Sequence, residues 1–137
     1  MWNAVDGEQR AVKAWPVDLD KGPVDIETID AIRALETPEN RHIFCDIVDA
    51  CIASAAELLD RLAPAANRGD AKGMAAVAHL LKSSSANVGA IILSDVCREL
   101  EKRTREGDLS GTPGLCNRVS AEFDAVRRLL EAEVRRH

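Results

Sequence analysis

The residue with the clearest chemical potential is His79, which lies among alanines, serines and leucines and is followed at the third position by Lys82. At about 100° per residue, four larger apolar side chains and two small residues of this segment gather on one side of a helical wheel. They are Met74, Val77, Ala78, Leu81, Ser85 and Val88. His79 lies roughly 160° from the centre of that arc. We therefore predict a helix whose apolar face enters a core and whose histidine projects into solvent.

The predicted surface around His79 is made of small side chains, although an exposed helix face normally carries Glu, Lys, Gln and Arg. The near neighbours of the ring are Ala75, Ala76, Ser83 and Ala86. Lys82, three positions on, and Lys72, seven positions back, lie toward the same side and add positive charge. Another protein could therefore reach the imidazole, and the lysines would favour an anionic adduct or partner.

The chemistry that this arrangement supports is transfer of a phosphoryl group to a ring nitrogen. Neutral imidazole is a competent nucleophile near pH 7 and needs no dedicated base. Lys82 would neutralise part of the charge on the moving group. The wheel alone leaves a second interpretation open, in which His79 is a surface histidine without a role.

The elements that must position His79 begin with two helices on its N-terminal side. A short helix is predicted over 25–36, because Asp25 can cap it and one apolar stripe runs along it. The stripe consists of Ile26, Ile29, Ile32 and Leu35. A long amphipathic helix is predicted to begin at 37–39, where Thr-Pro-Glu has the composition of a helix start, and to kink or end at Pro64.

Three further helices complete the scheme: the His79 helix over 70–88, one over 90–107, and a last one that begins at Thr112-Pro113. Short connections between long amphipathic helices make neighbours antiparallel. The predicted fold class is all-α, an antiparallel up-down-up-down four-helix bundle with a short additional N-terminal helix across one end. Residues 1–23 are interpreted as a linker or N-terminal strap, and 24–137 as the bundle domain.

Composition limits the function further. The chain has 137 residues with 18 Lys+Arg against 23 Asp+Glu, and a net charge of −5 argues against a nucleic-acid partner. Aromatic residues make up 3%, so aliphatic side chains must build the core. The 4 cysteines form no CxxC pair.

No apolar run is long enough to cross a membrane and no secretory signal is evident, so we expect a cytoplasmic protein without direct membrane contact.

The segment from Ala78 to Ala90, followed by Cys97-Arg98-Glu99-Leu100-Glu101, resembles the histidine-containing phosphotransfer (HPt) domains of bacterial multistep phosphorelays. The resemblance rests on a His-x-x-Lys core, a run of small residues and a downstream Leu-Glu helix, and it implies a helical bundle. It also implies that His79, through its Nε2 atom, accepts a phosphoryl group from an aspartyl phosphate on a receiver domain. The group then passes to the aspartate of another receiver.

The resemblance implies roles for three further residues. Lys82 matches the lysine that helps to hold the phosphoryl oxygens, and Arg105 falls where some members place a second basic or polar group. Ser83 stands where many members have glycine, and it leaves room for a docked receiver and could contact phosphate. The Mg²⁺ ion and the acidic pocket belong to the receiver, so no cofactor or metal is expected here.

The partners implied are receiver domains of response regulators or of a hybrid sensor histidine kinase. They would bind weakly to a monomer through a patch with an apolar centre, drawn from the long helix and the His79 helix. This patch would bury about 1,200 Å² in total or less.

Three other functions have some support in the sequence. The dimerisation domain of a sensor kinase usually has an acidic residue directly after its histidine, where this chain has Leu80, and the sequence has no Gly-rich phosphate loop. Glu39 and His42 give one Glu-x-x-His step, whereas a di-iron site needs two. A non-catalytic helical protein-interaction module, in which His79 is incidental, is the remaining alternative.

Overall fold

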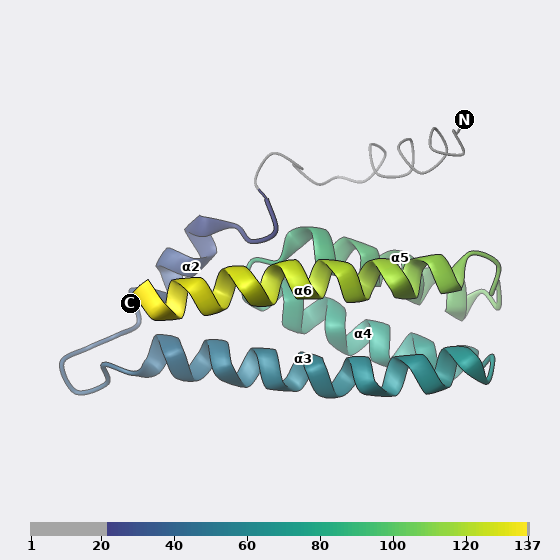
Figure 1. Ribbon diagram of the computed structural model, residues 1–137, viewed down its shortest axis with the longest axis horizontal. Helices are drawn as coiled ribbons and strands as arrows, with labels where there is room; N and C mark the ends of the chain where they lie inside the picture. Colours follow the sequence, from purple (N-terminus) through teal and green to yellow (C-terminus); the bar gives the residue numbers. More distant parts are fainter. Residues whose placement is uncertain (1–21, 137) are drawn as a thin grey trace.

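The computed structural model describes residues 22–136, which contain helices and no strand longer than an isolated bridge (Figure 1). The helices are α2 (Ile26–Arg33), α3 (Ile43–Asn67), α4 (Ala71–Asn87), α5 (Ile91–Arg105) and α6 (Thr112–Arg136). Helices α3 to α6 pack against one another in chain order, and α6 returns to pack on α3. The predicted fold class, an antiparallel four-helix bundle with a short N-terminal helix, is confirmed. The predicted strap at 1–23 lies almost wholly outside the described residues.

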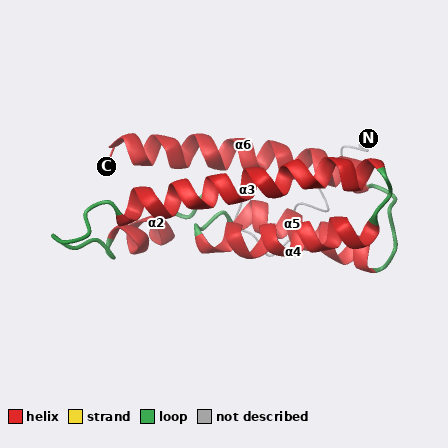
Figure 2. Cartoon of the chain, turned by 90° about the horizontal axis from the view of Figure 1, so that it is seen from below, coloured by secondary structure: helices red, strands yellow, loops and turns green. Residues whose placement is uncertain are grey.

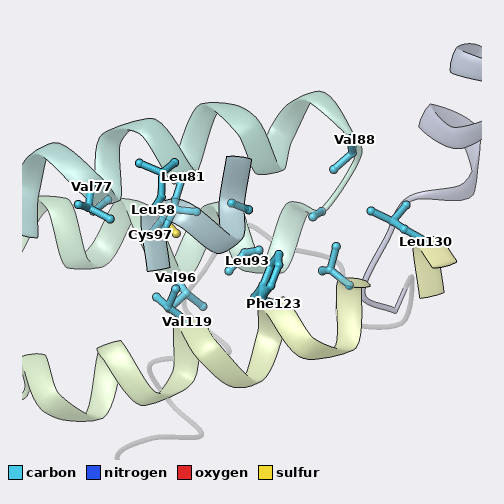
Figure 3. Packing of buried hydrophobic residues seen from close by; sticks show 14 of the residues in the cluster. Leu58, Val77, Leu81, Val88, Leu93, Val96, Cys97, Val119, Phe123 and Leu130 are labelled. Atoms are coloured by element: carbon cyan, nitrogen blue, oxygen red, sulfur yellow. The ribbon is translucent and has the colours of Figure 1, made fainter. Parts of the chain in front are cut away.

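The core is aliphatic, as the low aromatic content requires. Side chains from α3, α4, α5 and α6 meet along the bundle axis (Figure 3). The largest that are fully enclosed include Phe44, Leu62, Met74, Leu81, Leu93, Leu100 and Leu130. Each fully buried leucine contributes about 2 kcal/mol by removal of apolar surface from water. The bundle therefore provides a rigid frame for the face of α4 that carries His79.

Helix α2 closes one end of the bundle. Helices α4 and α5 have 17 and 15 residues, whereas α3 and α6 have 25 each, so the short α4–α5 hairpin leaves room for α2 beside its turn (Figures 1 and 2). At that turn the backbone N–H of Asp25 donates to the carbonyl of Gly89 at 2.8 Å. Gly89 has φ +77°, and a Cβ atom there would lie 2.7 Å from Cβ of Thr28. Only glycine allows α2 to approach this closely.

The other end of α2 is attached to α3 and α6 by a charged side chain. Arg33 Nη2 lies 2.6 Å from Glu133 Oε1 in α6, and its guanidinium carbon lies 4.7 Å from the centre of the Phe44 ring in α3. A cation above an aromatic face is attracted by the ring quadrupole. Arg33 therefore links three helices at the end of the bundle where α6 finishes.

The predicted start of the long helix at 37–39 is wrong. Those residues form a turn, in which the N–H of Asn40 donates to the carbonyl of Thr37, and α3 begins at Ile43. Glu36 supplies a hydrogen-bond acceptor at the observed N-terminus of α3, because its carboxylate accepts from the backbone N–H of Phe44 at 3.3 Å. A carboxylate at a helix N-terminus satisfies a free donor and complements the helix dipole.

Pro64 is predicted to kink or end the long helix; it does not end it, because α3 continues to Asn67. Pro64 lies on the exposed side of α3. A proline on that side leaves a carbonyl without its helical donor where water can bind it, so the cost is lower than in a buried helix.

Helix α2 is shorter than the predicted 25–36, and only two of the four residues in its predicted apolar stripe are buried. Asp25 caps it as predicted, by accepting from the N–H of Glu27. Ile29 and Ile32 are buried, whereas Ile26 and Leu35 are exposed. The helix ends at Arg33, so Leu35 leaves the helical phase that would have directed it inward.

The helix that carries His79 has clear ends. Its N-cap is Asp70, whose carboxylate accepts from the N–H of Gly73 at 2.9 Å. Its C-terminal turn closes through the left-handed backbone of Gly89. None of the helices within 22–136 combines the length and hydropathy needed to cross a bilayer.

Candidate functional site

His79 lies in the middle of α4 with its side chain 53% exposed. The predicted phase of the helix is confirmed, since Met74, Val77, Ala78, Leu81, Ser85 and Val88 are all buried. The surroundings are small, as expected: Ala76, Ser83 and Ala86 are exposed beside the ring. Ala75 differs from the prediction, because it is buried.

The structure adds a residue that the sequence analysis did not assign to the site. Glu101 in α5 faces α4, and its side chain is only 9% exposed. Its Oε2 lies 3.0 Å from His79 Nδ1, and its Oε1 accepts from Lys82 Nζ at 2.7 Å. Arg105, one turn further along α5, donates to Oε2 through Nε at 2.8 Å. One carboxylate therefore binds the imidazole and both predicted basic residues.

The protonation state of Glu101 follows from these contacts. Burial by itself would raise the pKa of the carboxyl group, but hydrogen bonds from Lys82, Arg105 and His79 outweigh burial and lower the pKa from 4.5 to about 2. Glu101 is thus ionised at neutral pH. Its two cationic partners compensate the buried charge, which would otherwise be costly.

The ionised carboxylate determines the tautomer of His79. A carboxylate can only accept hydrogen bonds, so the proton of a neutral imidazole must be on Nδ1, where it is donated to Glu101. The lone pair of the neutral ring is then on Nε2, the nitrogen on the other side of the ring. This geometry supports the ring atom that the resemblance implied, and it orients the nucleophile without the need for a base.

Lys82 and Arg105 are held at the site but keep unused donors. An ammonium group has three N–H bonds and a guanidinium has five, so each cation can bind a further anion while it contacts Glu101. The two cations exceed the charge of the single carboxylate by one unit. The site is therefore prepared for additional negative charge.

Ser83 and Cys97 lie close to the site and differ in environment. Ser83 is exposed, and its hydroxyl forms no hydrogen bond with another residue of 22–136. Its contact with phosphate stays a prediction. The Cys97 thiol is fully buried one turn before Glu101, and burial, aided by that carboxylate, raises its pKa to about 12. Cys97 stays protonated and does not compete as a nucleophile.

Glu101 could have been found from the sequence by its helical phase. It falls on the face of α5 that Cys97, Leu100 and Thr104 place in the interior. An acidic residue on a buried face requires cationic partners. That requirement points to Lys82 and Arg105, although the helix pairing that brings α4 to Glu101 was not available from the pattern.

The Glu-x-x-His step of Glu39 and His42 is not part of a group of metal ligands in the described residues. His42 is exposed at the N-cap of α3. Within the part of the chain that the structure describes, no three His, Cys, Asp or Glu side chains are grouped as metal ligands.

Comparison with known sequences and structures decides the family. A sequence model of the Hpt domain matches residues 46–129, which include His79 and Glu101. This chain belongs to the Hpt domain family. A search of curated proteins finds no significant match.

Two solved structures resemble this Hpt domain. The crystal structure of histidine-containing phosphotransfer protein B (HptB) from Pseudomonas aeruginosa PAO1 has 29% sequence identity and a TM-score of 0.77, covering 85% of this chain and 97% of that chain. The histidine-containing phosphotransfer protein ZmHP2 from maize has 23% identity and a TM-score of 0.75, covering 87% and 94%. The maize protein supports the fold. Together with the family match, the comparisons identify the chain as a histidine phosphotransfer intermediate of a phosphorelay.

Proposed function

We propose that His79 is the phosphoacceptor of this Hpt domain and that Nε2 is the atom that carries the phosphoryl group. The observation that supports the proposal is an exposed imidazole whose Nδ1 donates to a buried, ionised carboxylate at 3.0 Å. Exposure allows a partner to reach the ring. The hydrogen bond keeps the nucleophilic lone pair on the other nitrogen.

The donor in this proposal is an aspartyl phosphate on a receiver domain. The Nε2 lone pair attacks phosphorus, a P–N bond forms, and the P–O bond to the aspartate breaks to release its carboxylate. The proton on Nδ1 stays in its hydrogen bond to Glu101 throughout. The ring becomes positively charged as the phosphoryl group arrives, and the Glu101 carboxylate stabilises that charge. Reversal of the same step returns the phosphoryl group to the aspartate of a second receiver.

Lys82 and Arg105 balance the charge of the adduct in this proposal. Both are anchored to Glu101, at 2.7 Å and 2.8 Å, and neither has used all of its donors. Lys82 contacts the phosphoryl oxygens, and Arg105 makes the local field more positive. We expect Ser83 to leave space for the receiver, which brings the Mg²⁺ ion with it.

We further propose that the exchange takes place in the cytoplasm. The four cysteines are free thiols, which fits a reducing compartment. The expectation of a monomer stays a prediction that light scattering at several concentrations checks.

The test is transfer of label from a ³²P-phosphorylated receiver, chosen from a panel encoded in the same genome. We expect an acid-labile, base-stable product on the wild-type protein and none on His79→Gln. Because the ring is exposed, the helical circular dichroism and melting temperature of this variant should match those of the wild type. Labelling of His79→Gln, or no labelling of the wild type by any receiver, would exclude the proposal.

A further inference from the structure

A recess opens beside the site, between the N-terminal half of α4 and the end of α5. Its volume is about 460 Å³, and it is lined by Lys72, Ala75, Ala76, Thr104 and Arg105. We call it the Lys72–Arg105 recess. Alanine side chains and a buried threonine leave space between the two cations. The recess is thus wide enough for a side chain from another protein.

The recess is positively charged and its charge is only partly compensated. Arg105 is bound to Glu101, but no carboxylate of residues 22–136 pairs with Lys72, which is exposed in the first turn of α4. The hydroxyl of Thr104 donates to the carbonyls of Leu100 and Glu101 in its own helix, so the two cations dominate the polar lining. An anionic group is the complement that this recess lacks.

The position of the recess relative to His79 defines what can enter it. With a rise of about 1.5 Å per residue, Ala76 and Lys72 precede His79 by about 4.5 and 10.5 Å along the axis of α4. Arg105 joins the recess to the site, since its guanidinium also contacts Glu101. These distances are short enough for one protein interface to cover both the recess and His79. A protein that places a phosphoryl donor at Nε2 therefore covers the recess as well.

We propose that the Lys72–Arg105 recess is a specificity site for the receiver, and that it accepts an Asp or Glu side chain next to the receiver's phosphorylation site. The inference rests on the proposed function and extends it, since it names the feature that a partner must carry. A receiver with a carboxylate at that position gains an ion pair with Lys72. A receiver with a lysine or arginine there is repelled by both cations, which makes the recess a filter between partners.

The experiment compares Lys72→Glu with a matched control, Arg128→Glu. Both variants change the net charge by the same amount. Arg128 is exposed on α6, which packs against α3 and α5, whereas α4 lies diagonally across the bundle. A glutamate at position 72 lies in the first turn of α4, where negative charge is compatible with the helix dipole, so the variant should fold. Lys72→Arg keeps the charge and serves as the rescue.

Two phosphodonors separate docking from chemistry. The first is the phosphorylated receiver that transfers fastest to the wild type, and the second is phosphoramidate, a small donor that phosphorylates imidazole and releases ammonia. With the receiver, Lys72→Glu should raise the half-saturating receiver concentration about five- to tenfold at low salt, with a smaller effect at about 0.5 M salt. With phosphoramidate its rate should equal that of the wild type. Arg128→Glu and Lys72→Arg should resemble the wild type with both donors.

The experiment distinguishes failure of the specificity site from failure of the proposed function. If Lys72→Glu and Arg128→Glu give the same half-saturating concentration while the wild type accepts phosphate on His79, the specificity site is refuted and the proposed function stands. An equal loss with phosphoramidate would assign Lys72 to the chemistry and would also refute the docking role. Failure of every receiver to label the wild type would remove the proposed function, and the specificity site with it.

Discussion

Replacement of Glu101 by glutamine tests how the buried carboxylate acts on His79. In Glu101→Gln, the amide side chain would keep the volume of the native one and a carbonyl oxygen that accepts from Nδ1–H of His79. It would lose the negative charge. A hydrogen bond to a charged group contributes about 1.5–3 kcal/mol, against about 0.5–1.5 kcal/mol for a neutral one. The loss at the transition state, where the ring gains positive charge, is therefore about 1–1.5 kcal/mol. This corresponds to transfer that is about five- to tenfold slower.

The same substitution should lower stability, because Lys82 and Arg105 lose their anion. The fall in the pKa of Glu101 from 4.5 to about 2 corresponds to ~3 kcal/mol. Screening by water at the exposed guanidinium of Arg105 reduces this to about 1–2 kcal/mol. For a domain of this size, that loss corresponds to a melting temperature lower by about 3–8 °C.

The assay is rapid-quench transfer from a labelled receiver at about 25 °C, where the variant is still folded, with Glu99→Gln as the control. Glu99 is an acid of the same helix, paired with Arg103 at 2.7 Å and not with the site. We expect Glu99→Gln to keep the wild-type rate. A Glu101→Gln protein that transfers at the wild-type rate would refute the argument that the carboxylate stabilises the developing charge on the ring.

Three other predictions follow from the site and the core beneath it. Lys82→Ala should slow transfer about tenfold, equivalent to about 1.4 kcal/mol, without loss of helical circular dichroism; an unchanged rate would contradict its role at the phosphoryl group. Leu81→Ala, at a fully buried position, should lower the free energy of urea unfolding by about 3 kcal/mol, whereas Leu80→Ala, at an exposed one, should change it by less than about 0.5 kcal/mol. The pKa of Glu101 is lowered on folding, so its stabilisation is complete above about pH 4.5 and is lost as the pH falls toward about 2. The stability difference between the wild type and Glu101→Gln should therefore narrow over that range in acid titrations, and a constant difference would contradict the assigned ionisation.

The parts of this structure that follow from sequence are those governed by local periodicity. The phase of α4 could be predicted because apolar residues at steps of three and four define one face, and that face places His79 in solvent. Asp70 and Gly89 could be recognised as helix ends because capping is a local property. The start of α3 was missed because its capping acceptor, Glu36, comes from outside the helix across a turn.

The electrostatics of the site depend on how α4 packs against α5. Glu101 is 22 residues from His79 in sequence, and nothing in the periodicity of either helix gives the register that brings them together. His79, Lys82 and Arg105 could therefore be predicted from the sequence, whereas the carboxylate that joins them could not. An acidic residue on the buried face of α5 was the signal that could have been used.

The atom of His79 that carries the phosphoryl group can be identified by NMR of the ¹⁵N-histidine-labelled protein after transfer from a phosphorylated receiver. We expect phosphorus–nitrogen coupling to Nε2 of His79, while Nδ1 keeps its proton in the hydrogen bond to Glu101. Phosphorus bonded to Nδ1, or to any residue other than His79, would contradict it.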